Sequence, residues 1–366
     1  MNWLLMSRAY TMLKQFSTNA PENVKSLAVE DLQSMLAKSI NILINKFKAI
    51  DNIVMIADGG SWRKSLKQPS CIKDIVYKGN RKKDENTDWD LIFNTLNEFM
   101  KHAKTLGITT TQDFGVEGDD WAWYWSRKLN EEGINCMIWT SDNDLKQLVQ
   151  YDGEKNVFTA WYNDQAGLWF DEKMKGDDIV NAVDFFMAPI PVMNPLLEDM
   201  KRGARGPEHY INPFEIVLEK ILMGDAGDNI KPVARYVKNG REFKFSNTDF
   251  QKVVSNFTIN NIDDLLHQRQ EIAEFISNMK KFKPYNISPN DIVDMIVFNV
   301  RLVWLNDRVI PPEIREEMTG SEYKSFDLEE IRSNYKMLTQ EDTSYIENLF
   351  ETVGNDDIFN DFPEND

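Results

Sequence analysis

Two short apolar runs, each followed at once by an acidic turn, constrain the fold of this chain more than any other feature. NIVMIA (52–57) leads directly into Asp58, and INCMIWT (134–140) is followed two residues later by Asp142. Apolar runs of this length, ended by turn residues, are typical of buried strands, and segments with helical apolar spacing lie between them. Alternation of strands and helices predicts an α/β fold, with a mostly parallel sheet flanked by helices.

The chain is long enough, at 366 residues, for two or three subdomains. We expect residues 1–188 to form the α/β domain, with an excursion at 60–88 that runs over its surface. Residues 189–340 have mostly helical spacing and predict a helical subdomain, and residues 341–366 predict a flexible acidic tail. Within the first domain, NVFTAWYN (156–163) and GLWFD (167–171) predict a β-hairpin.

Composition excludes several classes of protein. No apolar run approaches the roughly 20 residues of a membrane span, and no basic-then-apolar signal opens the chain. Cys71 and Cys136 are the only cysteines, which predicts free thiols without a disulfide framework or a zinc site. We therefore expect a cytoplasmic protein with no membrane partner.

The distribution of charge is more informative than its sum. A net charge of −17 argues against a nucleic-acid partner, because phosphate contacts need Lys and Arg. Residues 63–83 nevertheless carry eight basic side chains and a single acid, whereas residues 341–366 carry nine acids and no Lys or Arg. The basic run predicts a phosphate-binding stripe that includes Arg63, Lys64, Lys78, Arg81, Lys82 and Lys83, with a solvated face as the alternative. Among the aromatics, Trp62 is the better candidate for a base contact, and the tryptophans of WAWYWS (121–126) favour core packing.

Acidic residues recur where the predicted strands end or where a helix begins. The set consists of Asp58, Glu117, Asp119, Asp120, Asp142, Asp144, Asp225 and Asp228. Loops at the carboxyl ends of parallel strands converge on one crevice, so these side chains are expected to meet there. Asp225 and Asp228 would face the same side if their segment is helical.

Crowded carboxylates repel one another unless a cation lies among them, and hard oxygen ligands suit Mg²⁺ or Mn²⁺. Two ions roughly 4 Å apart would activate a water and stabilise the leaving oxygen in phosphodiester hydrolysis. Each motif alone is more often a helix cap or a solvated turn. Their joint order favours a site for two divalent ions.

That order resembles the 5′-nuclease superfamily of flap endonucleases and 5′→3′ exonucleases, and within it the phage ribonuclease H type. The resemblance runs from about residue 2 to about residue 315. It is carried by Asp58 and by the motifs YKGNR (77–81), VEGDD (116–120), TSDNDLKQL (140–148) and MGDAGDNI (223–230). It implies a PIN-like fold and Mg²⁺-dependent cleavage near a 5′ end, in flap DNA and in RNA hybridised to DNA. It also implies removal of RNA primers or flaps during replication, in an infected bacterial cell if a phage encodes the chain.

The resemblance also implies a role for individual residues. The first metal site would hold Asp58, Glu117 and Asp119, and the second would hold Asp142, Asp144 and Asp225. Asp120 and Asp228 would support these ligands. Tyr77, Lys78 and Arg81 would lie in the arch through which the free 5′ strand passes.

Three departures from the family pattern lead to alternatives. NWLLMSRAY (2–10) resembles the helix that follows the family's first strand, so we expect that strand and its metal-binding Asp to be missing. A nucleic-acid-binding member of the fold that has lost turnover is therefore the alternative, and a PIN-domain ribonuclease is a third. No Gly-rich helical hairpin is evident in residues 231–246, although basic residues there suit duplex contact. The acidic tail, with Ile358, Phe359 and Phe362, suggests a peptide that docks a replication protein, with plain disorder as the alternative.

Overall fold

The structure is a computed structural model, and it describes residues 6, 8–47, 53–72, 76–163, 166–174 and 210–320. The predicted domain boundary near residue 188 and the acidic tail at 341–366 lie outside the described residues. Residues 1–5 also lie outside the described residues. Of the helix expected over residues 2–10, the structure therefore describes only the end, which leads into a short 3₁₀ turn, η1 (Tyr10–Met12).

Helices occupy both halves of the described chain. The α-helices are α2 (Glu22–Lys46), α3 (Trp89–Thr105), α4 (Gly118–Glu131), α7 (Pro213–Met223), α8 (Asn247–Asn256), α9 (Ile262–Asn278), α10 (Pro289–Val303) and α11 (Pro312–Thr319). Further 3₁₀ turns are η2 (Trp62–Ser65), η3 (Asn143–Leu148) and η5 (Lys283–Tyr285). Among these turns, η3 directly follows Asp142.

The strands belong mainly to the first half. They are β1 (Val54–Ile56), β2 (Thr109–Thr111), β3 (Cys136–Trp139), β4 (Gln150–Asp152), β5 (Val157–Asn163), β6 (Gly167–Asp171), β7 (Tyr210–Ile211), β8 (Arg235–Lys238) and β9 (Arg241–Lys244). The pairs β1–β2, β3–β5 and β6–β7 are parallel. The predicted hairpin is confirmed, because β5 and β6 pair antiparallel with Trp161 opposite Trp169.

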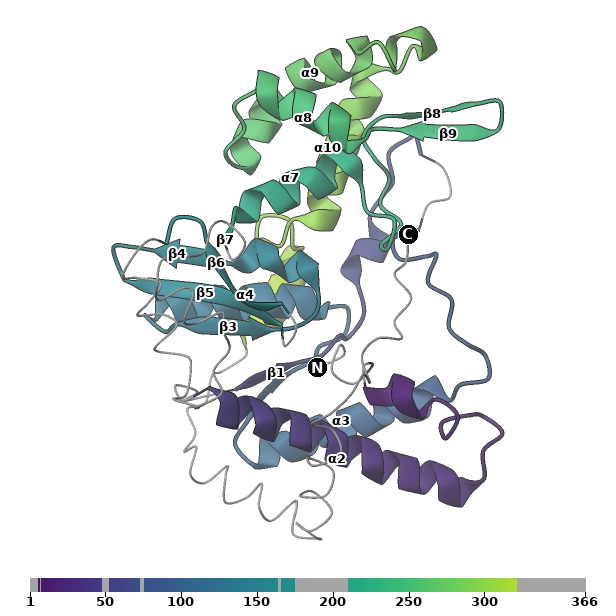
Figure 1. Ribbon diagram of the computed structural model, residues 1–366, viewed down its shortest axis with the longest axis vertical. Coiled ribbons are helices and arrows are strands. Elements are labelled where there is room, and N and C mark those ends of the chain that lie inside the picture. Colours follow the sequence, from purple (N-terminus) through teal and green to yellow (C-terminus); the bar gives the residue numbers. More distant parts are fainter. Residues whose placement is uncertain are drawn as a thin grey trace.

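Helices cover these strands, which confirms the α/β prediction (Figure 1). α4 packs against β1, β3 and β5, and α3 packs against β2 and α2. The inner face of α4 carries Trp121 and Trp125, which are 0 % and 2 % exposed. Their burial confirms that these tryptophans pack the core and are not available to stack on bases.

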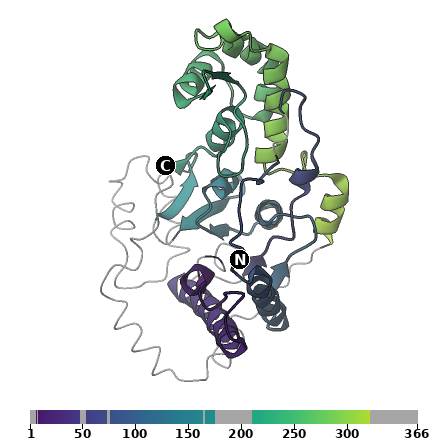
Figure 2. The ribbon, with the colours of Figure 1, turned by 90° about the vertical axis from the view of Figure 1, so that its right-hand side faces the viewer.

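The second half forms a helical layer above the strands (Figures 1 and 2). Its core is built by α7, α8, α9 and α10, with Leu222, Ile276 and Ile296 buried among them. Ile72 and Tyr77 pack into the same core. The excursion expected to run over the surface is therefore anchored to the helical half, because Ile72 and Tyr77 are buried there.

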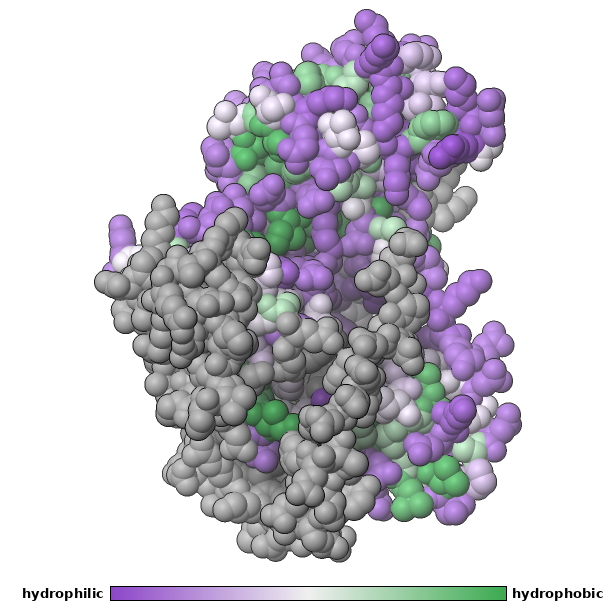
Figure 3. Space-filling model, viewed as in Figure 1, coloured by the Kyte–Doolittle hydropathy of each residue, from purple (hydrophilic) through white to green (hydrophobic). Residues whose placement is uncertain are grey.

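A β-ribbon formed by β8 and β9 follows α7, where the sequence suggested mainly helices and loops. Asn239 and Gly240 join the strands with φ angles of +53° and +73°, the left-handed conformation of a tight hairpin turn. The Asn-Gly pair in KNGR is the signal that sequence reasoning missed. The ribbon projects from the helical layer, whose visible face is mainly hydrophilic (Figures 1 and 3).

Within the described ranges, no helix combines the length and the apolar character that crossing a membrane requires.

Candidate metal and nucleic-acid site

Two loops fix the acidic residues at the end of β1. The backbone N–H of Gly59 donates to the carbonyl of Val116 (2.9 Å), and that of Gly115 donates to the carbonyl of Gly59 (3.0 Å). Oδ1 of Asp58 then accepts a hydrogen bond from the N–H of Gly118 (2.5 Å). Asp58 therefore caps the start of α4, where the positive end of the helix favours a carboxylate.

Asp119, in the first turn of α4, is the residue on which the acidic segments converge. Burial raises the pKa of Asp119 well above its usual range, and the negative charges of Asp142, Glu117 and Asp58 raise it further. Lys78 opposes that shift. These four neighbours come from β1, the α4 loop, the end of β3 and the basic run, so the structure brings distant carboxylates into one electrostatic environment.

We expect Asp119→Asn to stabilise the metal-free protein increasingly as the pH rises. A carboxyl whose pKa is raised on folding contributes stability that is fully present below its unfolded pKa of about 4 and is lost as pH rises through the folded value. The melting temperature in chelator should exceed the wild-type value at pH 8, and should exceed it by less at pH 5. If the variant and the wild type melted at the same temperature at both pH values, the proposed crowding of carboxylates around Asp119 would be contradicted.

A second acidic cluster lies between η3 and α7. Oδ1 of Asp142 accepts a hydrogen bond from the N–H of Asp144 (2.8 Å) and so caps η3. Nζ of Lys220, in the last turn of α7, contacts both Asp144 and Asp225, at 2.6 Å from Oδ2 of Asp225. Burial raises the pKa of Asp144, and Lys220 partly offsets this. One ammonium group thus bridges two of the predicted metal ligands and compensates part of their charge.

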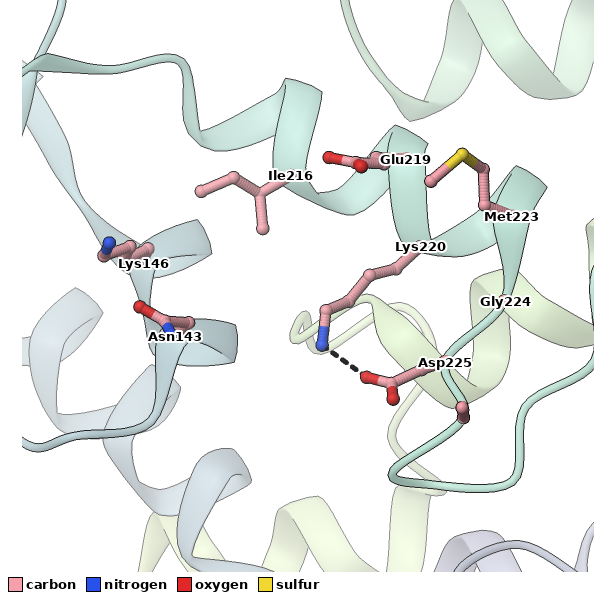
Figure 4. Close-up of a pocket in the computed structure, with 9 residues that line it drawn as sticks. Asn143, Lys146, Ile216, Glu219, Lys220, Met223, Gly224 and Asp225 are labelled. Carbon is pink, nitrogen blue, oxygen red and sulfur yellow. Dashed lines mark hydrogen bonds and ion pairs between the residues drawn. The ribbon is translucent and has the colours of Figure 1, made fainter. Parts of the chain in front are cut away.

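Lys220 was missed by sequence reasoning. It faces Asp225 across the end of α7, and Asn143 and Lys146 lie on the opposite wall (Figure 4). The space between them is a cavity of about 460 Å³. A lysine five residues before Asp225, in the last helical turn before the acidic loop, was the available signal.

The GDAGDN segment is a turn and not the helix that was considered. Asp225 and Ile230 form an isolated antiparallel bridge, and Oδ1 of Asp225 accepts hydrogen bonds from the N–H groups of Gly227 (2.7 Å) and Asp228 (3.3 Å). Gly224, just before the turn, has a φ of +74°, which lies outside the helical range and suits glycine. The helix α7 therefore ends before the turn. Asp225 and Asp228 consequently have different partners.

The structure corrects the prediction that Arg63 belongs to the phosphate-binding stripe. It is 2 % exposed, and its guanidinium donates to Glu117 (2.7 Å) and with two nitrogens to Asp120 (both 2.8 Å). Its Nε donates to the carbonyl of Leu302 in α10 (3.1 Å). A side chain held this way is a buried partner of carboxylates and has no open face for a nucleic-acid phosphate.

The prediction that Trp62 contacts a base is corrected for the same reason, through its contact with Asp120. Trp62 is 6 % exposed and its indole N–H donates to Oδ2 of Asp120 (2.9 Å), so it does not offer its ring to a base. Asp120 is fully buried, with both oxygens bound by Arg63 and Trp62. This geometry suits a supporting residue and leaves no room for direct coordination of an ion.

The YKGNR loop docks on the GDAGDN turn. The N–H of Lys78 donates to the carbonyl of Asp228 (2.9 Å), and the side chain of Asn80 donates to the carbonyl of Ala226 (2.9 Å). Arg81 pairs with Asp228 at 2.5 Å. The two motifs that carried the resemblance, about 150 residues apart, therefore meet in space.

Tyr77 and Lys78 face the acidic site and not the solvent. Tyr77 is 8 % exposed and its hydroxyl donates to Asp228 (3.2 Å), while Nζ of Lys78 donates to Glu117 (2.6 Å). Of the remaining residues predicted to bind nucleic acid, Lys64, Lys82 and Lys83 are exposed. Lys83 lies 5.1 Å from the ring centroid of Phe93.

The donor atoms suit hard divalent cations, although the site is arranged around basic side chains. In the part of the chain that the structure describes, no group of three or more His, Cys, Asp or Glu side chains is placed to hold an ion directly. Lys78 forms an ion pair with Glu117, and Lys220 forms ion pairs with both Asp144 and Asp225. Carboxylate oxygens that require cationic neighbours are the ligand type that Mg²⁺ and Mn²⁺ bind. An ion at either position would replace an ammonium group.

The described α/β domain gathers carboxylates at its strand ends, beside a basic loop. Residues 3–179 match the family described as 5′-3′ exonuclease, N-terminal resolvase-like domain. Over these residues, which are slightly less than half of the chain, the protein is similar to the N-terminal domain of 5′-3′ exonucleases.

Solved structures from bacteriophage T5 are similar to this chain. One is described as divalent metal ions (zinc) bound to T5 5′-exonuclease; it is 16 % identical, with a TM-score of 0.45, and the match covers 93 % of this chain and 96 % of that one. Another is a T5 flap endonuclease in a pseudo-enzyme-product complex with DNA and metal ions, 17 % identical, with a TM-score of 0.47 and coverages of 79 % and 88 %. No curated protein matches this chain.

Proposed function

We propose that this protein is a divalent-metal-dependent 5′→3′ exonuclease and flap endonuclease with ribonuclease H activity. Its task would be to remove RNA primers or 5′ flaps during DNA replication, in a bacterium infected by the phage that encodes it. The observation that carries the proposal is the convergence of carboxylates from β1, α4, η3 and the turn after α7 on one site. The match to a 5′-3′ exonuclease domain supports the polarity.

Two ions, Mg²⁺ or Mn²⁺, would be held by two groups of side chains. Asp58, Glu117 and Asp119 would hold the first, and Asp142, Asp144 and Asp225 the second. When bound, such ions supply an activated water and stabilise the leaving oxygen. Arg63 and Trp62 bind the carboxylate of Asp120, and Arg81 and Tyr77 bind that of Asp228. Both would therefore act as supports and not as ligands.

Lys78 and Lys220 would have a second role once their carboxylates turn to an ion. Each ammonium group lies within 2.6 Å of a proposed ligand, so each would stay close to the scissile phosphate when released. An ammonium there would attract the negatively charged backbone and position it. Burial lowers the pKa of each lysine, but the nearby carboxylates raise the pKa by more. Both lysines therefore stay charged.

The substrate would be DNA with a 5′ flap or RNA hybridised to DNA, approached from the side of the exposed lysines. Lys64 and Lys82 lie on the segments that flank the site, and both are exposed. Neither forms an ion pair with another described residue. Replacing both by Gln should lower the slope of log Kd against log salt by about 1.5, because each lost phosphate contact removes about 0.7–0.9.

The matched control for this pair is Lys101→Gln with Lys104→Gln, two exposed lysines of α3. The control removes the same charge from another element and should leave the slope unchanged. Equal slopes for the two double variants would mean that Lys64 and Lys82 belong to a solvated face.

The test of the function is cleavage of a 5′-labelled flap and of a 5′-labelled RNA–DNA hybrid, each with Mg²⁺ and with chelator. Short labelled products that form only with the metal would support the proposal. Intact substrates under both conditions, with a protein that binds them, would contradict it.

That second outcome would favour a nucleic-acid-binding protein of the same fold without turnover. The specific observation in its favour is that Lys78, Lys220 and Arg63 already neutralise the carboxylates. A replication protein bound through the acidic tail remains a further proposal, testable by deleting residues 341–366.

A further inference from the structure

Phe114 is the most exposed of the large hydrophobic side chains in the described ranges. It is 93 % exposed, compared with 69 % for Val237 and 56 % for Tyr10. A single exposed apolar side chain is ordinary on a protein surface. The loop that carries Phe114, and its position beside the acidic site, are the features that distinguish it.

This loop is rigid on both sides of Phe114. A Cβ atom added to Gly59 would lie 1.7 Å from the carbonyl oxygen of Asp113, so the two backbones are in the closest contact that glycine permits. Gly115 has a φ of +83°, and its carbonyl accepts a hydrogen bond from the N–H of Trp62 (2.9 Å). Phe114 is therefore held out into solvent by a fixed backbone.

The same contacts place the loop that carries Phe114 beside Asp58, one of the proposed metal ligands. The side chain of Gln112 donates to the backbone carbonyl of Asp58 (3.1 Å), and Gly115 bonds to Gly59, the residue after Asp58. Glu117 and Asp119 follow Phe114 by three and five residues. An aromatic ring thus stands on the loop that leads into Glu117 and Asp119, two carboxylates of the first proposed group.

We propose that Phe114 is a stacking platform for an unpaired base of the nucleic-acid strand at this site. This inference rests on the proposed function and adds to it a residue that positions the strand. An aromatic face stacks on any base and contributes about 1–3 kcal/mol per base. Because the loop is fixed in advance, little conformational entropy is lost when a base docks.

A protein partner fits this position less well. Gln112 and Asp113, which precede Phe114, are polar, and the side chain of Gln112 contacts the backbone of Asp58. A ring with polar neighbours does not form the contiguous apolar patch at the centre of a protein interface. A base, with a π face and polar edges, matches both the ring and its polar surroundings.

The test uses the full chain with Ca²⁺ in place of Mg²⁺, so that binding is measured without turnover. The probe is a 5′-flap DNA that carries 2-aminopurine in the unpaired strand at successive positions from the junction. Phe114→Leu, which keeps an apolar side chain but loses the ring, should weaken binding by about five- to a hundredfold. It should also abolish the fluorescence quench that stacking produces. Phe114→Tyr should retain both affinity and quench.

Tyr10→Leu is the matched control, because it removes an exposed aromatic ring from η1. Its affinity and quench should equal those of the wild type. If the wild type binds the flap and Phe114→Leu binds equally well with the same quench, the stacking role is wrong and the proposed function stands. If the wild type binds no nucleic acid, both proposals fail together.

Discussion

Asp225→Asn is expected to lower Mg²⁺-dependent cleavage by about a thousandfold or more while leaving the fold intact. Asp225 shares Lys220 with Asp144, and its loss removes a charge that the second ion would need. The turn should survive, because an Asn side-chain oxygen can still accept the hydrogen bonds from Gly227 and Asp228. Asp142→Asn should act in the same direction. The measurement is single-turnover cleavage of a flap substrate, with circular dichroism as the check on folding.

Asp263→Asn provides the matched control for the loss of one carboxylate. Asp263 is exposed and pairs with Arg308 on the surface of α9. It should retain wild-type cleavage, since a surface ion pair far from the acidic site has no part in the chemistry. Full activity in Asp225→Asn would remove this residue from the proposed ligand set.

Arg63→Met is expected to destabilise the protein by about 3–5 kcal/mol, the usual cost of breaking a buried ion pair from one side. The substitution leaves Asp120 buried with Trp62 as its remaining partner, and leaves Glu117 with Lys78 and Tyr77. It also removes the hydrogen bond to Leu302 that joins the α/β domain to α10. Chemical denaturation should show a lower midpoint for the transition.

Arg308→Met is the matched control, because it breaks an arginine–carboxylate pair that is exposed on both sides. Such pairs contribute about 0–1 kcal/mol, so its midpoint should stay near that of the wild type. A loss of less than 1 kcal/mol in Arg63→Met would mean that Glu117 and Asp120 do not depend on this guanidinium.

The sequence was sufficient to predict features that are set locally. The strands that precede Asp58 and Asp142 follow from short apolar runs with turn residues after them, and the β5–β6 hairpin follows from two strand-like runs on either side of a turn. The convergence of acids followed from a general rule about strand ends in α/β sheets. These features need no knowledge of distant partners.

The sequence could not indicate which basic residues are buried. Arg63 and Lys64 are neighbours of the same charge, yet Arg63 meets Glu117, Asp120 and the carbonyl of Leu302, and Lys64 remains exposed. That difference is decided by residues 54 to 239 positions away. Lys220 was missed for the same reason, because helical spacing does not show that its ammonium lies between two carboxylates of different loops.

The account depends most directly on divalent ions replacing Lys78 and Lys220 among the carboxylates. Isothermal titration calorimetry of the metal-free protein with Mn²⁺, in the wild type and in Asp225→Asn, tests this without any substrate. We predict saturable binding to the wild type, with fewer ions bound by Asp225→Asn. Absence of binding to the wild type at millimolar Mn²⁺ would contradict the proposed metal site and the hydrolytic function that rests on it.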